Sequence, residues 1–437
     1  MDGLDRLADN PVADRDVRGV LVCNPSPFPA TIQPSLPAAW FVKGDPETSR
    51  TARASRMFYH QRPWGRDFPG PDARPVGPIH LDPFTWRAIP LEDLPAPPDE
   101  PTVSHTIESE RTERRELNFA ATSTSVRDVG RISSPFHVLS YDVGTGRILS
   151  LVDRRQDREL LTGEHGLDFF SFVRERPDPL VDRSRHAYYE RNLDREKYDL
   201  SCWRDWSSVR ERAMRVIDSS VNLGPGRVTF ERTIEAAGVT HLVQRVSLLA
   251  GDPVIGLEVE LELAPDPNPQ GIYLAFPLKM NREWQAAFDT AGDFVRLDAD
   301  QLPGSCRNWV TAESVAAMWD DEGVIALLVP DSPNVQFGDF HFGPPLDSIP
   351  RPHNPLLLAW PVNNYWDTNF AQTQPGRIHL RYGFLSLPTA DLDEIHRHAT
   401  TVRQSPIVWP ITSGGRQAGT GDLPGSREAQ GSGSARR

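Results

Sequence analysis

The sequence predicts an all-β fold of the antiparallel sandwich type. Proline (41 residues) and glycine (31 residues) interrupt the chain so often that long helices have little room, whereas short strands joined by turns fit well. The 437 residues are 38% hydrophobic and 24% charged, which is globular composition in a chain too long for one ordinary core. We therefore expect two or three domains.

Residues 15–95 are predicted to form a small β-domain. Its first strand is the apolar run VRGVLVC at 17–23, which stops at Asn24-Pro25, and the apolar segment 79–94 closes the domain. The residues that follow, 96–116, are first proline-rich and then charged, which is the composition of a linker.

Residues 117–390 carry the clearest strand signals. In 137–153, Gly144 and Gly146 separate two alternating apolar runs, a pattern that predicts a β-hairpin whose turn needs positive φ. In 255–263, apolar residues alternate strictly with charged ones, as on a half-buried strand. Further predicted strands are 227–236, 241–250, 271–278, 323–330, 355–361 and 377–387.

Little helix is expected in this chain. Residues 391–408 begin with a candidate Asp cap and have helical spacing, so they predict a short helical segment, and 207–218 are expected to start one or two helical turns. From 409 to 437 the sequence is so polar and glycine-rich that it predicts a disordered tail.

Charge and cysteine content exclude several functional classes. Acidic residues outnumber basic ones by 60 to 47, and the formal charge of −13 disfavours a nucleic-acid partner. Cys23, Cys202 and Cys306 lie far apart without CxxC spacing, which indicates neither a disulfide framework nor a zinc site. The N-terminal residues lack the pattern of a secretory signal, and no stretch reaches the roughly 18 continuous apolar residues of a membrane span. We expect a soluble, cytoplasmic protein without a membrane partner.

The most obvious row of carboxylates is Glu258, Glu260 and Glu262, on the polar face of 255–263. Hydrolysis of a glycosidic bond usually needs two carboxylates held about 5 to 9.5 Å apart, a distance that a sequence does not supply. We interpret this row as a solvated face whose charges are compensated by arginines on neighbouring strands.

Residues 186–206 mix His186, Tyr188 and Tyr189 with further aromatic and charged side chains. Such mixtures suit carbohydrate, because rings pack against the apolar faces of sugars while charged groups bind their hydroxyls. They equally suit a long loop that is anchored on a sheet by its rings, which is the reading we favour.

A second polar and aromatic stretch, PVNNYWDTNFAQTQPG at 361–376, allows the same two readings. Its amides and carboxylate can tie an irregular loop to its own backbone, with the rings buried, or they can form a wall of a sugar site. The candidate residues are Asn363, Asn364, Tyr365, Trp366, Asp367 and Asn369.

His80 and Asp82 have the HxD spacing from which one strand can offer two zinc ligands. A catalytic zinc needs at least a third ligand from a neighbouring element, and a single HxD is a weak signal. We interpret the pair as part of the closing strand of the small β-domain and expect no metal.

Several segments, in order, resemble the C-terminal β-domains of glycoside hydrolase family 38, the α-mannosidase family. They are VLVCNPSPFPATI (20–32), YDVGTGRILSLVDRRQDRELL (141–161), LDADQLPGSCRNWVTAESVAAMW (297–319), PDSPNVQFG (330–338), VNNYWDTNFAQTQPG (362–376) and HLRYGFLSL (379–387). Ordered agreement over about 15–390 is more specific than any one segment.

The resemblance implies a small β-sandwich followed by a large supersandwich of the galactose-mutarotase-like kind. It also implies that residues 1–14 are the end of a preceding helical segment. The catalytic residues and zinc of the family belong to an N-terminal α/β barrel that this sequence lacks, so no catalytic residue can be carried over and no cofactor is expected here. Arg307 and Trp309 would face carbohydrate or the barrel, together with the candidates in 361–376.

Three hypotheses follow from these observations. The first is a β-sandwich portion of an α-mannosidase-like hydrolase, which binds carbohydrate or docks on a separate catalytic barrel without being catalytic alone. The second is a self-sufficient sugar epimerase or polysaccharide lyase, with His186 and Tyr188 or Tyr189 as the first acid–base pair to test. The third is a structural role in a homo-oligomer.

Overall fold

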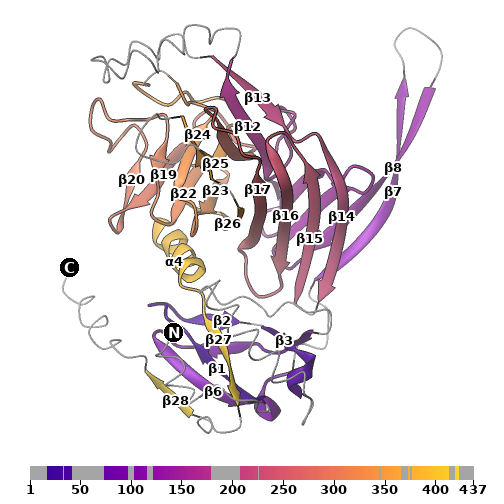
Figure 1. Ribbon diagram of the computed structural model, residues 1–437, viewed down its shortest axis with the longest axis vertical. Coiled ribbons are helices and arrows are strands. Elements are labelled where there is room, and N and C mark those ends of the chain that lie inside the picture. Colours follow the sequence, from indigo (N-terminus) through magenta and orange to yellow (C-terminus); the bar gives the residue numbers. More distant parts are fainter. Residues whose placement is uncertain are drawn as a thin grey trace. The chain divides into compact units, whose positions relative to one another are not determined.

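The computed structural model describes residues 17–32, 34–41, 73–96, 103–115, 122–178, 207–224, 226–343, 346–365, 373–374, 376–412 and 419–422. The chain divides into two compact units (Figure 1). The small unit comprises 1–101, 224–226 and 397–437, and the large unit comprises 102–223 and 227–396. The expected helical remnant at 1–14 lies outside the described residues.

The small unit is built on a four-stranded sheet in the order β27-β1-β6-β28. Its strands are β27 (Ile407–Thr412), β1 (Val17–Cys23), β6 (Thr85–Pro90) and β28 (Gly419–Asp422). Two strand pairs and two short 3-10 helices accompany it: β2 (Ala30–Ile32) with β5 (Ile79–Leu81), β3 (Ser35–Pro37) with β4 (Ala73–Pro75), η1 (Ala38–Phe41) and η2 (Leu91–Asp93). Leu21, Trp40 and Trp409 are buried together in its core.

The expected disordered tail is wrong at two places. Residues 409–412 belong to β27, which pairs antiparallel with β1, and 419–422 form β28, which pairs with β6. The average composition of 409–437 is polar, and it therefore gave no sign of Trp409 and Ile411, whose side chains are buried in the core of the small unit. The first sheet therefore takes strands from both ends of the chain.

The large unit contains three antiparallel sheets, of nine, six and five strands among the described residues. The nine-stranded sheet is, in order, β14 (Arg215–Gly224), β15 (Arg227–Glu235), β16 (Val239–Leu249), β17 (Ile255–Leu263), β26 (Arg377–Leu387), β23 (Gly323–Leu328), β22 (Val315–Asp320), β19 (Gln285–Thr290) and β20 (Asp293–Arg296). The six-stranded sheet is β13 (Ser208–Arg212), β12 (Ser171–Pro177), β18 (Gly271–Pro277), β25 (Leu356–Asn363), β24 (Asn334–Gly338) and β21 (Val310–Thr311).

The five-stranded sheet is β11 (Arg158–Glu159), β10 (Ile148–Asp153), β9 (His137–Asp142), β8 (Thr122–Ser133) and β7 (Ser104–Arg115). Buried residues of all three sheets form one hydrophobic core, in which the rings of Phe169 and Phe384 meet edge to face with centroids 4.9 Å apart. The one α-helix among the described residues, α4 (Leu392–Arg403), lies where the helical segment was expected. The predicted all-β fold, a small β-domain followed by a large antiparallel sandwich, is confirmed.

Two local signals decided their elements correctly. β17 buries every second residue from Ile255 to Leu263, as the strict alternation predicts. The β9–β10 turn places Gly146 at φ 64, where its N–H donates to the Asp142 carbonyl at 2.8 Å. A Cβ at this glycine would lie 2.7 Å from Val216 Cγ1, so close packing as well as the positive φ requires glycine.

Two charged stretches were assigned wrongly. Most of the expected linker 96–116 is β7, which pairs with β8 along its full length in a long hairpin (Figure 1). Residues 207–218, expected to start a helix, are instead β13 and the beginning of β14. In both, charges that indicate a linker or a helix face are neutralised across strands, as in the ion pair of Arg131 with Glu110 at 2.8 Å.

The carboxylate row on β17 is a compensated polar face, as predicted. Glu258 lies 3.0 Å from His379 and Glu260 lies 3.0 Å from Arg245, both on neighbouring strands. Arg245 also pairs with Glu231, so the ladder continues onto β15.

A buried polar network joins the five-stranded and nine-stranded sheets. Ser386 of β26 donates its hydroxyl to Asp153, and Nε2 of His137 lies 3.2 Å from the same hydroxyl. Burial, aided by the positive charge of Arg155 and opposed by Asp153, lowers the pKa of His137 to about 4. Burial raises the pKa of Asp153, but the hydrogen bonds from Arg155 and Ser386 outweigh it and lower that pKa to about 2.

Stability should therefore fall as the pH drops from about 6.5 to about 4, because the unfolded chain binds a proton at His137 that the folded protein rejects. Below that, protonation of Asp153 continues the loss as its folded pKa of about 2 is approached. We expect His137→Asn to flatten the first step, by up to about 3 kcal/mol between pH 7 and pH 4, in urea unfolding. The exposed His353→Asn is the matched control; a wild-type profile in both variants would contradict the prediction.

Two cysteines in the described residues differ in their exposure to solvent. Cys23 is buried in β1, where burial raises the pKa of its thiol to about 12, whereas Cys306 is exposed. Native protein treated with iodoacetamide at pH 8 should be alkylated at Cys306 and spared at Cys23, as read by peptide mass mapping. Modification of both at equal rates without denaturant would contradict this.

Among the described residues, no helix combines the length and apolar character that a membrane crossing requires.

Candidate functional site

The six-stranded sheet is covered on both faces. Along β18, Ile272, Leu274 and Phe276 point into the large core, whereas Tyr273 and Ala275 belong to a second cluster on the opposite face. The strand is fully buried, which explains why its sequence is apolar throughout instead of alternating.

Aromatic rings dominate this second face. We call Tyr273, Trp309, Phe340, Phe342, Trp360 and Tyr365 the aromatic cluster. Tyr365 stacks on Phe342 with centroids 4.0 Å apart, and Trp309 meets Trp360 edge to face at 5.7 Å. Trp309 and Phe340 are only partly buried, so the cluster offers ring surface at its rim.

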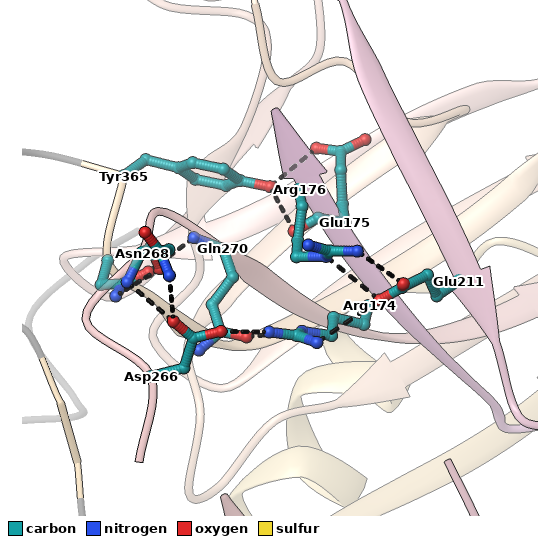
Figure 2. Close-up of polar contacts among 9 residues, drawn as sticks. Arg174, Glu175, Arg176, Glu211, Asp266, Asn268, Gln270 and Tyr365 are labelled. Carbon is teal, nitrogen blue, oxygen red and sulfur yellow. Dashed lines mark hydrogen bonds and ion pairs between the residues drawn. The ribbon is translucent and has the colours of Figure 1, made fainter. Parts of the chain in front are cut away.

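Glu175, on β12, is the polar centre beneath the cluster and is fully buried. Tyr365 donates its hydroxyl to the Glu175 carboxylate at 3.0 Å, as Figure 2 shows, and Arg210 donates Nε at 2.7 Å. Burial and the charge of Glu175 raise the pKa of Tyr365 well above its ordinary value, so this hydroxyl stays protonated and donates. The Arg210 guanidinium also lies over the Phe340 ring at 4.5 Å.

A second polar group borders the first (Figure 2). Arg174 donates to Gln270 and to Asp266, both at 2.7 Å, and Arg176 donates to Glu211 at 2.6 Å. Burial raises the pKa of Asp266, but hydrogen bonds from Asn268 and the charge of Arg174 outweigh it, so its pKa is lowered. The Asp266 carboxylate therefore remains charged, and both carboxylates are engaged by arginine.

Asn364 ties the start of the 361–376 stretch to this group. Its side-chain oxygen accepts from the Gln270 N–H at 2.6 Å, and its backbone N–H donates to the Gln270 carbonyl at 3.0 Å. Its amide nitrogen donates to the Asn268 carbonyl at 3.1 Å. The stretch thus begins as a tightly held loop, in accordance with the structural reading of its amides.

The structure brings together only some of the predicted site residues. Asn363 ends β25, and Asn364 and Tyr365 follow it. Trp309 packs against the same aromatic cluster as Tyr365. Arg307 turns elsewhere: its Nε donates to Asp298 at 3.0 Å, outside the cluster. The remaining candidates lie outside the described residues: Trp366, Asp367, Asn369, His186, Tyr188 and Tyr189.

Other residues of the site were not foreseen from the sequence: Glu175, Arg210, Tyr273, Phe340 and Phe342. A signal existed in SFVRERP, the sequence of β12, because charges in a strand that is otherwise buried indicate a paired polar network. Phe340 and Phe342 carry no comparable signal, since isolated rings in a turn-rich stretch are common.

The HxD pair is engaged in an ordinary surface contact. Nδ1 of His80 lies 2.8 Å from the Thr31 hydroxyl on the paired strand β2. Within the described part of the chain, no three or more His, Cys, Asp or Glu side chains are grouped as metal ligands would be.

What the aromatic site can do chemically follows from these contacts. Glu175 accepts hydrogen bonds from Tyr365, Arg210 and Ser208, and its side chain is inaccessible to solvent, so it is poorly placed to exchange a proton with a ligand. The rigid network instead fixes the rings above it. Partly exposed rings beside a half-exposed guanidinium suit ligands that have both apolar faces and hydroxyl groups.

No protein-family model and no curated protein matches the chain. Solved structures are similar in fold: an α-mannosidase from Enterococcus faecalis has a TM-score of 0.48 at 8% identity, covering 93% of this chain and 47% of its own. A glycosyl hydrolase family 38 protein from the same organism has a TM-score of 0.45 at 8% identity, covering 93% and 48%. A galactose mutarotase-like protein from Lactobacillus casei has a TM-score of 0.32 at 11% identity, covering 59% and 99%. The chain spans about half the length of the first two, and the similarity concerns the fold alone.

Proposed function

We propose that this chain is a carbohydrate-binding β-sandwich portion of an α-mannosidase-like glycoside hydrolase and is not catalytic on its own. One observation carries the proposal. Trp309 and Tyr365, from two of the segments that resemble the α-mannosidase family, meet in the aromatic cluster although they are far apart in the sequence. Both rings contact Phe342, so one surface joins the two segments.

The chemistry of this surface supports binding. Pyranose rings have apolar C–H faces that pack on aromatic side chains, and their hydroxyls bind amides and guanidinium groups. Trp309 and Phe340 provide ring surface at the rim, where the Arg210 guanidinium lies over the Phe340 ring. Asn364 directly precedes Tyr365 of the cluster. The ligand class we propose is a mannoside-type glycan, which the sequence resemblance suggests.

The engaged state of the carboxylates supports a non-catalytic role. A glycosidase needs one carboxyl group able to donate a proton and a second able to attack or to activate water. Glu175, Glu211 and Asp266 are each held by arginine. We propose that catalysis would require a separate barrel docked on this chain or carried by a partner.

Trp309→Ala should weaken binding of an α-linked mannotetraose by at least about tenfold, because it removes one of the two partly exposed rings of the aromatic cluster. Isothermal titration calorimetry measures the change. Trp319→Ala is the matched control, since Trp319 is also partly buried but lies on β22 of the nine-stranded sheet. Equal affinities for the two variants would contradict the proposed site.

The non-catalytic part of the proposal has its own test. The purified chain is incubated with an aryl α-mannoside and added zinc or cobalt, and release of the aryl group is followed. We expect no turnover. Clear hydrolysis that a chelator abolishes would overturn it.

A further inference from the structure

The five-stranded sheet carries a hollow on the face opposite the large core. The hollow has a volume of about 580 Å³, within the range of about 300–1,000 Å³ typical of small-molecule sites. None of its lining residues belongs to the aromatic cluster. It is thus a second candidate site within the large unit.

The strand register places the lining side chains in rows. Arg131 is opposite Ser140, and Ser140 is opposite Ser150, so one row crosses β8, β9 and β10. A second row pairs Val138 with Val152 beside it. Residues opposite each other on antiparallel strands point to the same side, so both rows face the hollow together.

Four of the residues that line the hollow are aliphatic: Val129, Val138, Leu149 and Val152. Val129 is 2% exposed although it lies on the outer side of the sheet, which shows that its neighbours wall it in. Leu149, by contrast, is 37% exposed at the edge. This combination gives a ligand an apolar surface without a deep, dry pocket.

Three arginines (Arg127, Arg131 and Arg154) and two carboxylates (Glu110 and Asp157) line the hollow, and Glu108 and Asp142 pair with two of these arginines from beside it. Arg131 pairs with Glu108 and with Glu110, the latter at 2.8 Å, and Arg127 pairs with Glu110 at 3.3 Å and Asp142 at 3.8 Å. Guanidinium groups already neutralised by carboxylates hold a free anion weakly, because the anion must displace or face those carboxylates. A phosphate or sulfate group is therefore disfavoured at Arg127 and Arg131.

Hydrogen-bonding capacity nevertheless remains. Arg154 lines the hollow, and the described residues engage it only through Nη1, which donates to the Ser134 carbonyl at 2.9 Å. A guanidinium has five N–H donors, so Arg154 retains several for a ligand. The Ser140 hydroxyl and the outer lone pairs of the paired carboxylates add acceptors.

We propose that this hollow binds a neutral oligosaccharide. Aliphatic side chains meet the C–H faces of the sugar rings, while Arg154, Ser140 and the balanced Arg–Glu pairs exchange hydrogen bonds with the hydroxyls. A neutral ligand with both donors and acceptors matches this surface, where three guanidinium groups and four carboxylates, counting Glu108 and Asp142, nearly cancel. The inference takes its ligand class from the proposed function but rests on different residues.

The test is isothermal titration of the full chain with two neutral probes, an α-linked mannotetraose and cellotetraose, and one acidic probe, a tetragalacturonate. Ser140→Trp fills the hollow at a strand position that tolerates an aromatic residue, and Arg154→Gln removes the guanidinium with most of its N–H donors. Arg215→Gln is the matched control, because its guanidinium also lies on an exposed strand and pairs with Glu235 at 2.6 Å. We expect Ser140→Trp and Arg154→Gln to bind one neutral probe at least tenfold more weakly than the wild type, and Arg215→Gln to bind it with wild-type affinity. The unfolding transitions of all three variants should be unchanged.

Three results would overturn the inference: wild-type affinity for the neutral probes in Ser140→Trp and Arg154→Gln, no binding of either neutral probe to the wild type, or binding of the acidic probe alone in the hollow. The two sites are separable. If Trp309→Ala abolished glycan binding and Ser140→Trp left it unchanged, the aromatic site would be supported and the hollow rejected. If Ser140→Trp abolished binding and Trp309→Ala left it unchanged, the hollow would be supported and the aromatic site rejected.

Discussion

Replacing Glu175 with alanine is expected to lower the free energy of unfolding of the large unit by about 3 kcal/mol. The substitution removes the acceptor of Tyr365, Arg210 and Ser208 at once, in a place that water does not reach. A buried donor left without a partner costs about 1–3 kcal/mol. Tyr365 and Tyr273, whose hydroxyls both lie near the Glu175 carboxylate, are deeply buried. Urea unfolding followed by tryptophan fluorescence measures the loss.

Two further variants sharpen this measurement. Tyr365→Phe removes one hydroxyl and keeps the ring stacked on Phe342, so it should cost only about 1 kcal/mol. Glu283→Ala, at an exposed position, should change stability by less than about 0.5 kcal/mol. If Glu175→Ala unfolded at the same urea concentration as Glu283→Ala, the network would not support the aromatic cluster. Weaker glycan binding in Glu175→Ala with folding retained would link that support to the proposed site.

Arg232→Met is expected to cost more, about 4 kcal/mol at pH 7. The Arg232 side chain is buried on β15, where it donates to Gln244 at 2.8 Å and to the Phe169 carbonyl at 3.0 Å and pairs with Asp168. Burial raises the pKa of Asp168, but the charge of Arg232 and hydrogen bonds outweigh it, so its pKa is lowered and the carboxylate is charged in the folded protein. Methionine would leave that charge buried and unpaired.

Because the loss of stability in Arg232→Met comes from the unpaired charge of Asp168, it should depend on pH. Without Arg232, burial would dominate and Asp168 would bind a proton more readily when folded, so the stability deficit should shrink between pH 7 and pH 4. Adding Asp168→Asn to Arg232→Met should recover part of the loss at pH 7, since no buried charge remains. Arg296→Met is the control, because its ion pair with Asp300 is solvent-exposed and should contribute little. A deficit independent of pH and unrelieved by Asp168→Asn would exclude an electrostatic origin.

Arg232 also shows where pattern reasoning ends. Along β15, Val228, Phe230 and Ile234 occupy the buried face, and alternation alone assigns Arg232 to the same face. The sequence thus correctly predicts the strand and the side, but a period of two says nothing about which residues will neutralise a buried guanidinium. Its partners come from a loop before β12 and from β16.

The candidate site divides in the same way. Asn364 and Tyr365 could be selected from the sequence, because polar and aromatic residues gathered in a short turn-rich stretch are visible locally, whereas Trp309 was selected through the family resemblance of its segment. Glu175 could not be assigned a role, because its partner Tyr365 lies 190 positions away in the chain. The predictions for the charged stretches of β7 and β13 were wrong for the opposite reason. The local composition of these stretches resembles a linker and a helix, and only pairing with neighbouring strands neutralises their charges.

By itself, the sequence determined the all-β class, the two-unit order, the buried face of β17 and the turn at Gly146, because strand alternation and backbone sterics act over a few residues. Only the tertiary structure decided that the first sheet includes strands from both chain ends, that the six-stranded sheet is covered on both faces, and that Glu175 and Arg232 find partners. Burial of a charged or aromatic group depends on what the rest of the chain brings against it, and no local pattern encodes that.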